Sequence, residues 1–254
     1  MRILIITQND PFYLYEPINY FLNNLPTYAD IIGAIILKPS PYGKKESYFK
    51  KAYKLLNIFG LKLSIYLGIK FFINKIKKKT AYHAFKRNGI EIIKLKNRLN
   101  SPESINLIKK CAPDLIISIS ANEIFKKDLI KIPSKGCINL HSALLPKYRG
   151  LMPTFWALKN GEKEAGISVF FIDEGIDSGP ILIQKKVILD EKTTLESLIK
   201  KTKRIGMDAL IEAIQIIYKG NYNLIPNDER DMTYYSFPKK QDVIEFKKLG
   251  RRFY

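Results

Sequence analysis

Five short apolar runs, separated by segments with helical patterns, constrain the fold of this 254-residue chain more than any other feature. Each run is rich in β-branched residues and is apolar at successive positions, as expected of parallel strands buried on both faces. The runs are Ile3–Thr7, Ile31–Leu37, Ile90–Leu95, Asp114–Ile119 and Cys137–Leu140. Helical patterns lie between them, for example at Leu14–Leu25 and at Pro102–Lys110, where Ser101 is suited to be the N-cap. This alternation predicts an α/β fold with a doubly wound, mostly parallel sheet.

After the fifth run the order of elements changes. The pattern there predicts a helix, two strands and a long helix at Pro153–Lys159, Gly166–Ile172, Pro180–Leu189 and Thr194–Tyr218. We therefore expect one domain over residues 1–219, followed by a C-terminal extension over 220–254. The extension is too short to bury a core of its own, so it should pack on the domain.

The composition places the chain among globular proteins. With 46% apolar and 26% charged residues it can bury a core, which excludes a disordered or collagen-like chain. Two cysteines, Cys111 and Cys137, cannot form a disulfide framework or a multi-cysteine zinc site, and we predict no metal. The apolar run that follows Met1 and Arg2 is too short for the core of a secretory signal. These features predict a cytoplasmic protein.

The net charge of +19 is concentrated in one segment. Between Lys38 and Arg98 there are 17 basic residues and two acidic ones. We interpret residues 43–88 as a basic helical insert, hinged near Gly60 or Gly68, whose uncharged runs are too short to span a bilayer. Three interpretations remain open: the apolar side packs on the domain, it contacts an anionic membrane surface, or the lysines follow a nucleic-acid backbone.

The loop after the first strand has no glycine. It reads Gln8-Asn9-Asp10-Pro11-Phe12. A dinucleotide-binding fingerprint needs glycines at this point so that the main chain can approach a pyrophosphate. The sequence therefore argues against NAD or FAD in the usual site.

Three polar residues form the candidate site. Asn139 and His141 alternate at the end of a predicted buried strand, so their side chains should point to one face. Asp177 follows in a loop bracketed by Gly175 and Gly179. An amide and an imidazolium can hold a developing oxyanion, and a carboxylate can orient the imidazole and help to move a proton. This set suits acyl transfer to an amine, although each residue alone is as typical of a hydrogen-bonded core pair or a turn.

Taken together, these residues and their neighbours in the sequence resemble the folate-dependent formyltransferase family, which includes methionyl-tRNA, glycinamide ribonucleotide and sugar N-formyltransferases. The resemblance rests on the run Asn139-Leu140-His141-Ser142-Ala143-Leu144-Leu145-Pro146 together with Asp177. It implies a Rossmann-like formyltransferase fold. One departure is visible, because Ala143 stands where the family usually has serine.

The resemblance also implies a donor and roles for the site residues. The donor is expected to be 10-formyltetrahydrofolate. Asn139 and His141 would stabilise the oxyanion of a tetrahedral adduct, while Asp177 would orient His141 and take up or relay the proton of the amine. The residues expected to line the pterin site are Asn122, Glu123, Ile124, Phe125, Ile172 and Asp173.

The resemblance favours the sugar enzymes among these relatives. The run Pro146-Lys147-Tyr148-Arg149-Gly150 is closer to the tRNA and sugar enzymes than to the purine enzyme, and the extension is short, as in the sugar enzymes. We therefore expect a nucleotide-linked amino sugar as the acceptor, in surface polysaccharide synthesis, and a homodimer as in the family. The alternatives are a methionyl-tRNA formyltransferase-like enzyme, with nucleic acid the less favoured partner, and a non-catalytic folate-binding protein. Peripheral membrane contact through the insert stays open.

Overall fold

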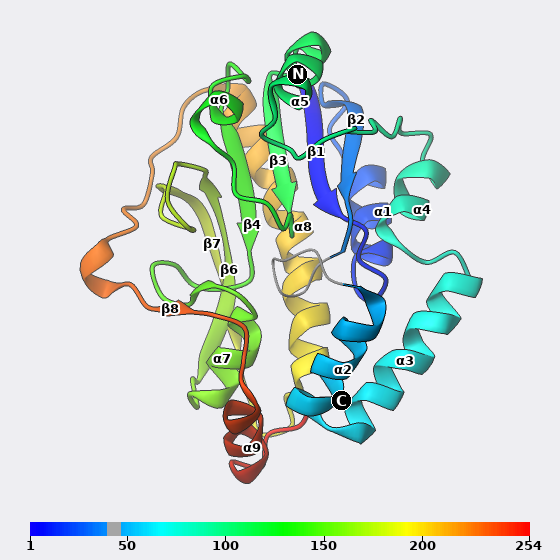
Figure 1. Cartoon of the computed structure of the whole chain (residues 1–254). Helices are drawn as coiled ribbons and strands as arrows, with labels where there is room; N and C mark the ends of the chain where they lie inside the picture. Colours follow the sequence, from blue (N-terminus) through cyan, green and yellow to red (C-terminus); the bar gives the residue numbers. More distant parts are fainter. Residues whose placement is uncertain (40–46) are drawn as a thin grey trace.

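The computed structural model describes residues 1–39 and 47–254, and is built on a six-stranded sheet in the order β2-β1-β3-β4-β6-β7 (Figure 1). The strands are β1 (Arg2–Gln8), β2 (Asp30–Leu37), β3 (Leu115–Ile119), β4 (Cys137–His141), β6 (Glu164–Phe171) and β7 (Ile181–Ile188). The first four pair in parallel, whereas β6 runs antiparallel to both β4 and β7. The predicted α/β fold with a mostly parallel sheet is confirmed.

Helices cover both faces of the sheet because its strands are apolar at successive positions. Ile3 and Ile5 of β1 belong to the cluster formed with α1 (Tyr15–Asn23), α4 (Ala81–Arg87) and α8 (Leu195–Lys219). Leu4 and Ile6 belong to the cluster on the other face, with α5 (Pro102–Cys111) and α6 (Lys127–Ile130). Helix α5 begins as predicted, since Ser101 Oγ accepts a hydrogen bond from the main-chain N–H of Ser104 at 3.2 Å.

The run at 90–95 does not form the predicted strand. The segment lies beside the edge strand β2, where Ala34 N donates to Glu91 O at 2.8 Å and Ile93 N donates to Ala34 O at 2.9 Å. These bonds make one isolated bridge, between Ala34 and Ile92. The apolar pattern identified a segment packed on the sheet, but its two bonds at the edge do not extend into a ladder.

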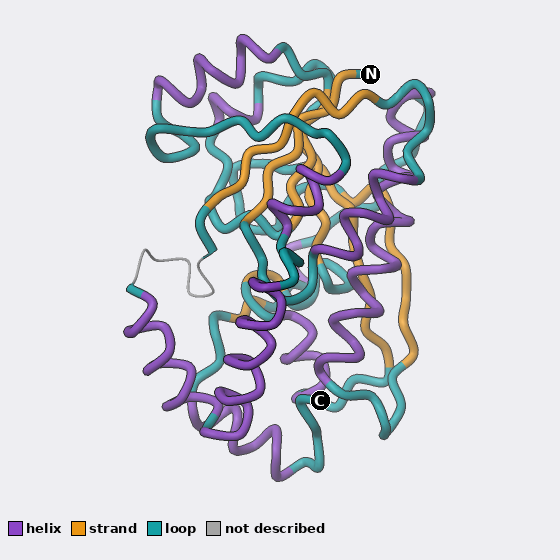
Figure 2. Tube along the Cα trace, turned by 90° about the vertical axis from the view of Figure 1, so that its right-hand side faces the viewer, coloured by secondary structure: helices purple, strands orange, loops and turns teal. Residues whose placement is uncertain are grey.

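The basic segment forms two helices, α2 (Tyr48–Phe59) and α3 (Leu61–Ile76), at the end of the molecule opposite the N-terminus (Figures 1 and 2). They meet at Gly60, whose φ of +86° favours glycine, so the chain breaks at one of the two predicted hinges. Gly68 lies inside α3. The predicted start of the insert, near residue 43, lies outside the described residues. Helix α4, at its predicted end, buries Ala81, Ala84 and Phe85 in the main core.

The segment after α8 wraps back over the loop that follows β4. Its short strand β8 (Tyr234–Tyr235) pairs in parallel with β5 (Arg149–Gly150), as the segment drawn in orange shows in Figure 1. Helix α9 (Lys240–Lys248) then packs on α2 and on α7 (Pro153–Lys159), with Phe246 stacked on Phe155 at a centroid distance of 4.9 Å. The division of the chain at residue 219 stays a prediction, but the extension is packed as the sequence suggested.

Candidate active site

Strand β4 carries the first two predicted site residues to the end of the sheet. Asn139 pairs in register with Ser118 of β3 and Phe170 of β6, and His141 pairs with Ser168 of β6. The two side chains share one face because successive residues of a strand alternate. This edge holds the carboxyl ends of β1, β3 and β4, where open α/β sheets bind their ligands.

His141 is buried and both of its ring nitrogens face protein groups. Nε2 lies 2.8 Å from the main-chain oxygen of Tyr148. A carbonyl oxygen only accepts, so Nε2 must carry a proton and donate it. In the neutral ring the other nitrogen, Nδ1, is therefore an acceptor, and it lies 3.6 Å from Oδ2 of Asp177. A proton taken up by this pair would bridge the two side chains.

Asp177 reaches the imidazole from a tight loop. Its φ of +50° is unusual for a residue with a side chain, and its Oδ2 accepts a hydrogen bond from Gly150 N at 2.8 Å. The carboxylate is thus fixed between His141 and the main chain of β5. The structure brings His141 and Asp177 together, 36 positions apart in the sequence, as the predicted site requires.

The Asn139 amide stands apart from this pair. The side chain is half-buried, and within residues 1–39 and 47–254 it forms no hydrogen bond. A half-buried amide with both donors available suits a group that binds a ligand oxygen. Asn139 therefore offers a hydrogen-bond donor on the face of β4 that also carries His141.

The turn after His141 is held by residues of β6 and β7. Ser168 Oγ donates to Ala143 O at 2.7 Å and accepts from Leu145 N at 3.1 Å, while Gln184 Nε2 donates to Leu145 O at 2.6 Å. The bond between Leu145 and Pro146 is cis. Because these contacts use main-chain atoms, the turn keeps its partners although Ala143 lacks the hydroxyl of the family serine.

The segment after α8 contributes residues that the sequence did not identify. Asn227 Nδ2 donates to the main-chain oxygens of Asp177 at 2.9 Å and Gly179 at 2.8 Å. Arg149 Nη2 in turn donates to Asn227 Oδ1 at 2.9 Å, and Tyr148 N donates to Thr233 Oγ1 at 2.8 Å. Arg149 is buried, and its Nε has no partner among the described residues. The extension thus holds the loop that carries Asp177 and the segment whose Tyr148 carbonyl accepts from His141.

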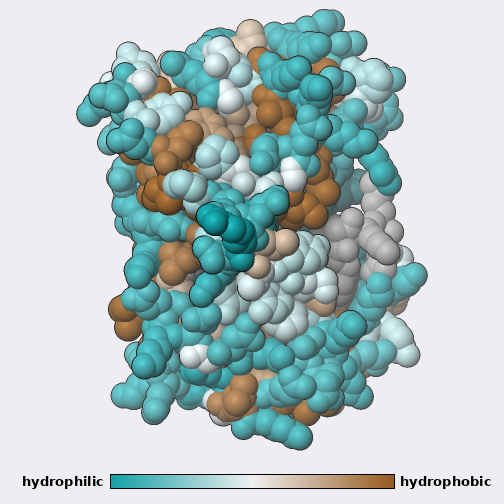
Figure 3. All heavy atoms as spheres, turned by 90° about the vertical axis from the view of Figure 1, so that its left-hand side faces the viewer, coloured by the Kyte–Doolittle hydropathy of each residue, from teal (hydrophilic) through white to brown (hydrophobic). Residues whose placement is uncertain are grey.

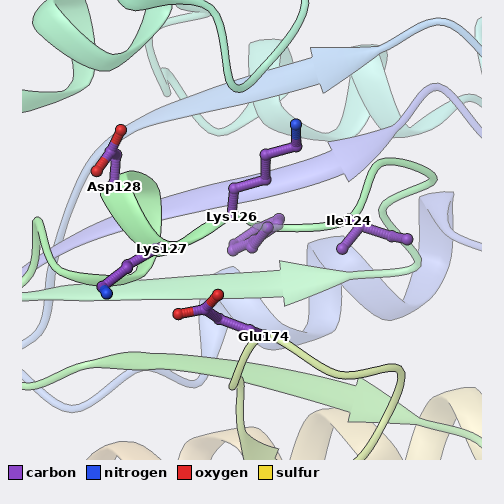
Figure 4. A pocket seen from close by; sticks show the side chains of 6 residues that line it. Ile124, Lys126, Lys127, Asp128 and Glu174 are labelled. Carbon is purple, nitrogen blue, oxygen red and sulfur yellow. The ribbon is translucent and has the colours of Figure 1, made fainter.

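Two of the six predicted pterin residues line a surface hollow of about 530 Å³ (Figure 4). Ile124 and Phe125 line one side and Glu174 the other, together with Lys126, Lys127 and Asp128. Ile124 is 59% exposed, whereas Phe125 is buried in the core. Asn139, His141 and Asp177 are not among the residues that line this hollow.

The remaining pterin residues are engaged by the protein. Asn122 Nδ2 donates to Lys38 O at 2.9 Å, and Glu123 Oε2 accepts from Leu99 N at 3.1 Å. Asp173 Oδ1 accepts from Gly175 N at 3.0 Å, and Ile172 packs on the core. Of the six, Ile124 alone presents a large exposed apolar side chain, and the pterin assignment stays a prediction.

Lys203 is a charged residue near the site that the sequence did not single out. It extends from α8, and its Nζ donates to Ser120 Oγ at 2.6 Å. Ser120 follows Ile119, which pairs with Leu140, so it lies level with His141 along the sheet. Burial lowers the pKa of Lys203, and the neighbouring carboxylate of Asp10 opposes that effect. The sequence did not distinguish Lys203, because it is one of several lysines in a long helix.

The family of the chain follows from a direct comparison. The family model described as formyl transferase matches residues 72–214, more than half of the chain. This protein belongs to the formyl transferase family. The matched part includes Asn139, His141 and Asp177, whereas most of the basic segment precedes it.

Curated relatives within the formyl transferase family include methionyl-tRNA formyltransferases. The methionyl-tRNA formyltransferases of Kosmotoga olearia and Thermodesulfovibrio yellowstonii are each 39% identical, over 61% and 57% of this chain and 50% and 47% of their own length. This chain therefore spans about half the length of the curated relatives it matches.

Solved structures of the formyl transferase family align over more of the chain. The N-formyltransferase of Helicobacter canadensis, in complex with folinic acid and dTDP-3-aminofucose, gives a TM-score of 0.58 at 19% identity, covering 95% of this chain and 72% of that one. Phosphoribosylglycinamide formyltransferase of Anaplasma phagocytophilum gives 0.62 at 16% identity, covering 94% and 99%. At these identities the likeness establishes the fold.

Proposed function

We propose that this protein transfers a formyl group from 10-formyltetrahydrofolate to a primary amine. The observation that carries the proposal is the His141–Asp177 pair, 3.6 Å apart at the carboxyl end of β4. The Asn139 amide, which has no hydrogen-bond partner in the part of the chain that the structure describes, lies on the same face. The match to the formyl transferase family supports the donor. The Helicobacter canadensis neighbour, solved with folinic acid, supports it by fold.

In this proposal the amine nitrogen attacks the formyl carbon, and a new C–N bond forms. The bond from that carbon to the folate nitrogen breaks, tetrahydrofolate leaves, and the amine loses one proton. The Asn139 amide donates a hydrogen bond to the oxyanion of the adduct. The His141–Asp177 pair takes up the proton of the amine and returns it to the folate nitrogen as the bond to the formyl carbon breaks, and the positive charge that His141 holds in between also favours the oxyanion.

This assignment refines the role expected of His141. Its Nε2–H is already donated to Tyr148 O, so a direct hydrogen bond from Nε2 to the oxyanion would compete with that contact. The nitrogen that can accept a proton is Nδ1, which faces Asp177. We therefore place His141 and Asp177 together as the proton acceptor and Asn139 as the oxyanion donor.

We propose an amino sugar linked to a nucleotide as the acceptor. Asp10 Oδ1 accepts hydrogen bonds from Phe12 N at 2.8 Å, Tyr13 N at 2.5 Å and Leu14 N at 3.2 Å. These main-chain donors at the start of α1 are of the kind that bind a phosphate in other α/β proteins, and here a carboxylate occupies them. This supports an acceptor held elsewhere, rather than glycinamide ribonucleotide held by its phosphate in that loop. In this proposal Lys203, whose Nζ donates to Ser120 Oγ at 2.6 Å, pairs with the diphosphate of such an acceptor.

A second acceptor, methionyl-tRNA, is favoured by the names of the sequence relatives. Formyl transfer to a panel of amines, read as product mass, separates the two candidates. The panel contains nucleotide-linked amino sugars, glycinamide ribonucleotide and charged initiator tRNA. We expect one amino sugar to be modified. Modification of the tRNA alone would replace the sugar proposal, and folate binding without transfer to any amine would indicate a non-catalytic protein.

A further inference from the structure

Helix α3 turns an apolar stripe toward solvent. Six large apolar side chains are exposed along it, and their exposed fractions range from 45% at Ile73 to 80% at Ile76. We call this set the outer stripe; it consists of Leu61, Ile65, Ile69, Phe72, Ile73 and Ile76. At about 100° per residue these positions fall within an arc of roughly 120°. The stripe is as wide as the face that a surface helix normally buries, yet none of it is buried among the described residues.

The orientation of α3 is fixed by its opposite face. Lys70 Nζ donates to Glu196 Oε1 at 2.6 Å, and Tyr66 donates its hydroxyl proton to Glu196 Oε2 at 2.5 Å. The Tyr66 ring stacks on Tyr254 at a centroid distance of 4.4 Å, and Leu63 is buried. A lysine is therefore turned inward while isoleucines and a phenylalanine are turned outward. This inversion indicates that something other than this domain covers the stripe.

Lysines border the outer stripe. Lys75 and Lys77 lie about 40° outside its two edges, and Lys62 lies near its N-terminal end. Lys78 follows the helix. All four are exposed, and no ion pair to them is formed by the part of the chain that the structure describes. An apolar stripe between unpaired lysines is typical of a helix that lies in the interface of an anionic bilayer.

Helix α2 adds further exposed apolar side chains to the same end of the molecule. Phe49 is 90% exposed and Tyr53 66% exposed, and they lie one turn apart. By contrast, the face on the side of β7 in Figure 3 is mostly hydrophilic, with separate apolar groups. No helix of the described residues is long and apolar enough to cross a membrane. The arrangement therefore suits a helix pair that lies on a bilayer.

We propose that the outer stripe and its bordering lysines bind the surface of an anionic membrane. A second copy of the chain is a poor occupant, because two such faces would bring like charges of the basic segment together. Nucleic acid would use the lysines but leave six apolar side chains in water. Anionic lipid satisfies both, since acyl chains cover the stripe and headgroups pair with the lysines. The proposal does not depend on formyl transfer.

Co-sedimentation with vesicles tests the proposal. Vesicles of phosphatidylcholine with roughly 30% phosphatidylglycerol should bind the protein at about 0.05 M salt, and vesicles of phosphatidylcholine alone should bind it far less. The double variant Ile69→Ser/Phe72→Ser should weaken binding to the anionic vesicles about tenfold or more, because both side chains lose their transfer into the interface. Lys75→Glu/Lys77→Glu should also weaken it.

Matched variants exclude non-specific effects. Ile188→Ser/Leu224→Ser removes exposed apolar side chains away from α2 and α3, 68% and 42% exposed, and Lys110→Glu/Lys219→Glu makes the same charge change away from α3. Both should leave vesicle binding within twofold of the unmodified protein. Three outcomes would overturn the proposal: no binding to anionic vesicles at low salt, equal loss with the control pairs, or a dimer in sedimentation velocity that Ile69→Ser/Phe72→Ser dissociates.

Discussion

Asn227 holds the loop of Asp177 through its main chain, donating to the carbonyl oxygens of Asp177 at 2.9 Å and Gly179 at 2.8 Å. The loop carries the carboxylate that faces His141, so Asn227 positions a proposed catalytic group without touching the reacting atoms. A displacement of about 1 Å at such a site can reduce turnover about a hundredfold. We therefore expect Asn227→Ala to lower kcat about tenfold to a hundredfold with little change in KM.

Asn223→Ala is the matched control for this effect, since Asn223 is exposed in the same segment and forms no hydrogen bond within the described residues. A purely structural role for Asn227 would lower the melting temperature and leave the kcat of the folded fraction intact. Single-turnover rates on protein with a verified melting transition separate the two. Unchanged kcat in folded Asn227→Ala would contradict the positioning role.

The His141–Asp177 pair should be essential for transfer but not for folding. His141→Ala removes the nitrogen that accepts the proton, and Asp177→Asn removes the carboxylate that favours the protonated ring, so we expect formyl transfer to fall at least about a hundredfold to a thousandfold in each variant. Asp177→Asn keeps an oxygen that can accept from Gly150 N, so its loop should remain in place. Product mass after long incubation and the thermal midpoint are the two measurements. Near-normal turnover in either folded variant would refute the site assignment.

Asn139 provides an independent test of how the roles are divided. Asn139→Ala removes the proposed oxyanion donor and leaves the proton acceptor intact. Its rate should fall about a hundredfold while the pH dependence of the remaining activity stays that of the unmodified protein. A changed pH profile would instead place Asn139 in the proton transfer.

Much of the sheet, and the shared face of two candidate site residues, could be predicted from the sequence because local patterns determine them. Runs that are apolar at successive positions predicted the strands β1 to β4. The alternation of side chains along a strand predicted that Asn139 and His141 share one face. The run at 90–95 has the same composition but lies at an edge with two main-chain bonds, which composition does not reveal. Strand propensity was overridden there by position in the fold.

Contacts between distant loops were not accessible from the pattern. Asn227 donates a hydrogen bond to the main chain of Asp177, which lies 50 positions earlier in the sequence. The Tyr148 carbonyl accepts a hydrogen bond from Nε2 of His141 because the loop after β4 turns back on its strand. Asp177 adopts a positive φ although it is not glycine, and the turn signals around it did not indicate which residue of the loop would do so. A surface helix usually turns its apolar face to the core, but in α3 Lys70 lies inside and Ile76 lies outside. The sequence therefore predicted that this segment is helical but not which of its faces packs on the domain.

Lys203 should affect binding of an anionic acceptor more than the chemical step. Its Nζ lies 2.6 Å from Ser120 Oγ at the strand edge that carries His141. Burial lowers the pKa of Lys203, and a bound diphosphate would favour its charged form. We expect Lys203→Met to raise KM for a nucleotide-linked acceptor about tenfold with kcat nearly unchanged. Lys219→Met, at the exposed end of the same helix, is the control; an equal KM in both variants would exclude the role.

Glu196 should make the attachment of α3 sensitive to acid. Burial alone would raise the pKa of Glu196, but hydrogen bonds from Lys70, Tyr66 and Lys200 outweigh it and lower the pKa from 4.5 to about 2. A carboxyl with a lowered pKa in the folded state stabilises it above the unfolded pKa, and that stability is lost as pH falls through the folded pKa. The loss should therefore occur between about pH 5 and pH 2 and amount to at most about 3 kcal/mol.

Glu196→Gln separates this contribution from general acid denaturation. The variant leaves Lys70 beside a neutral amide, and we expect it to be about 2–4 kcal/mol less stable at pH 7, with a smaller further loss on acidification than the unmodified protein shows. Glu212→Gln, which removes an exposed pair with Lys185, should cost about 1 kcal/mol or less. Urea unfolding at pH 7, 5 and 3, each on the three proteins, measures these differences. Parallel pH profiles for Glu196→Gln and the unmodified protein would show that Glu196 does not carry the acid sensitivity.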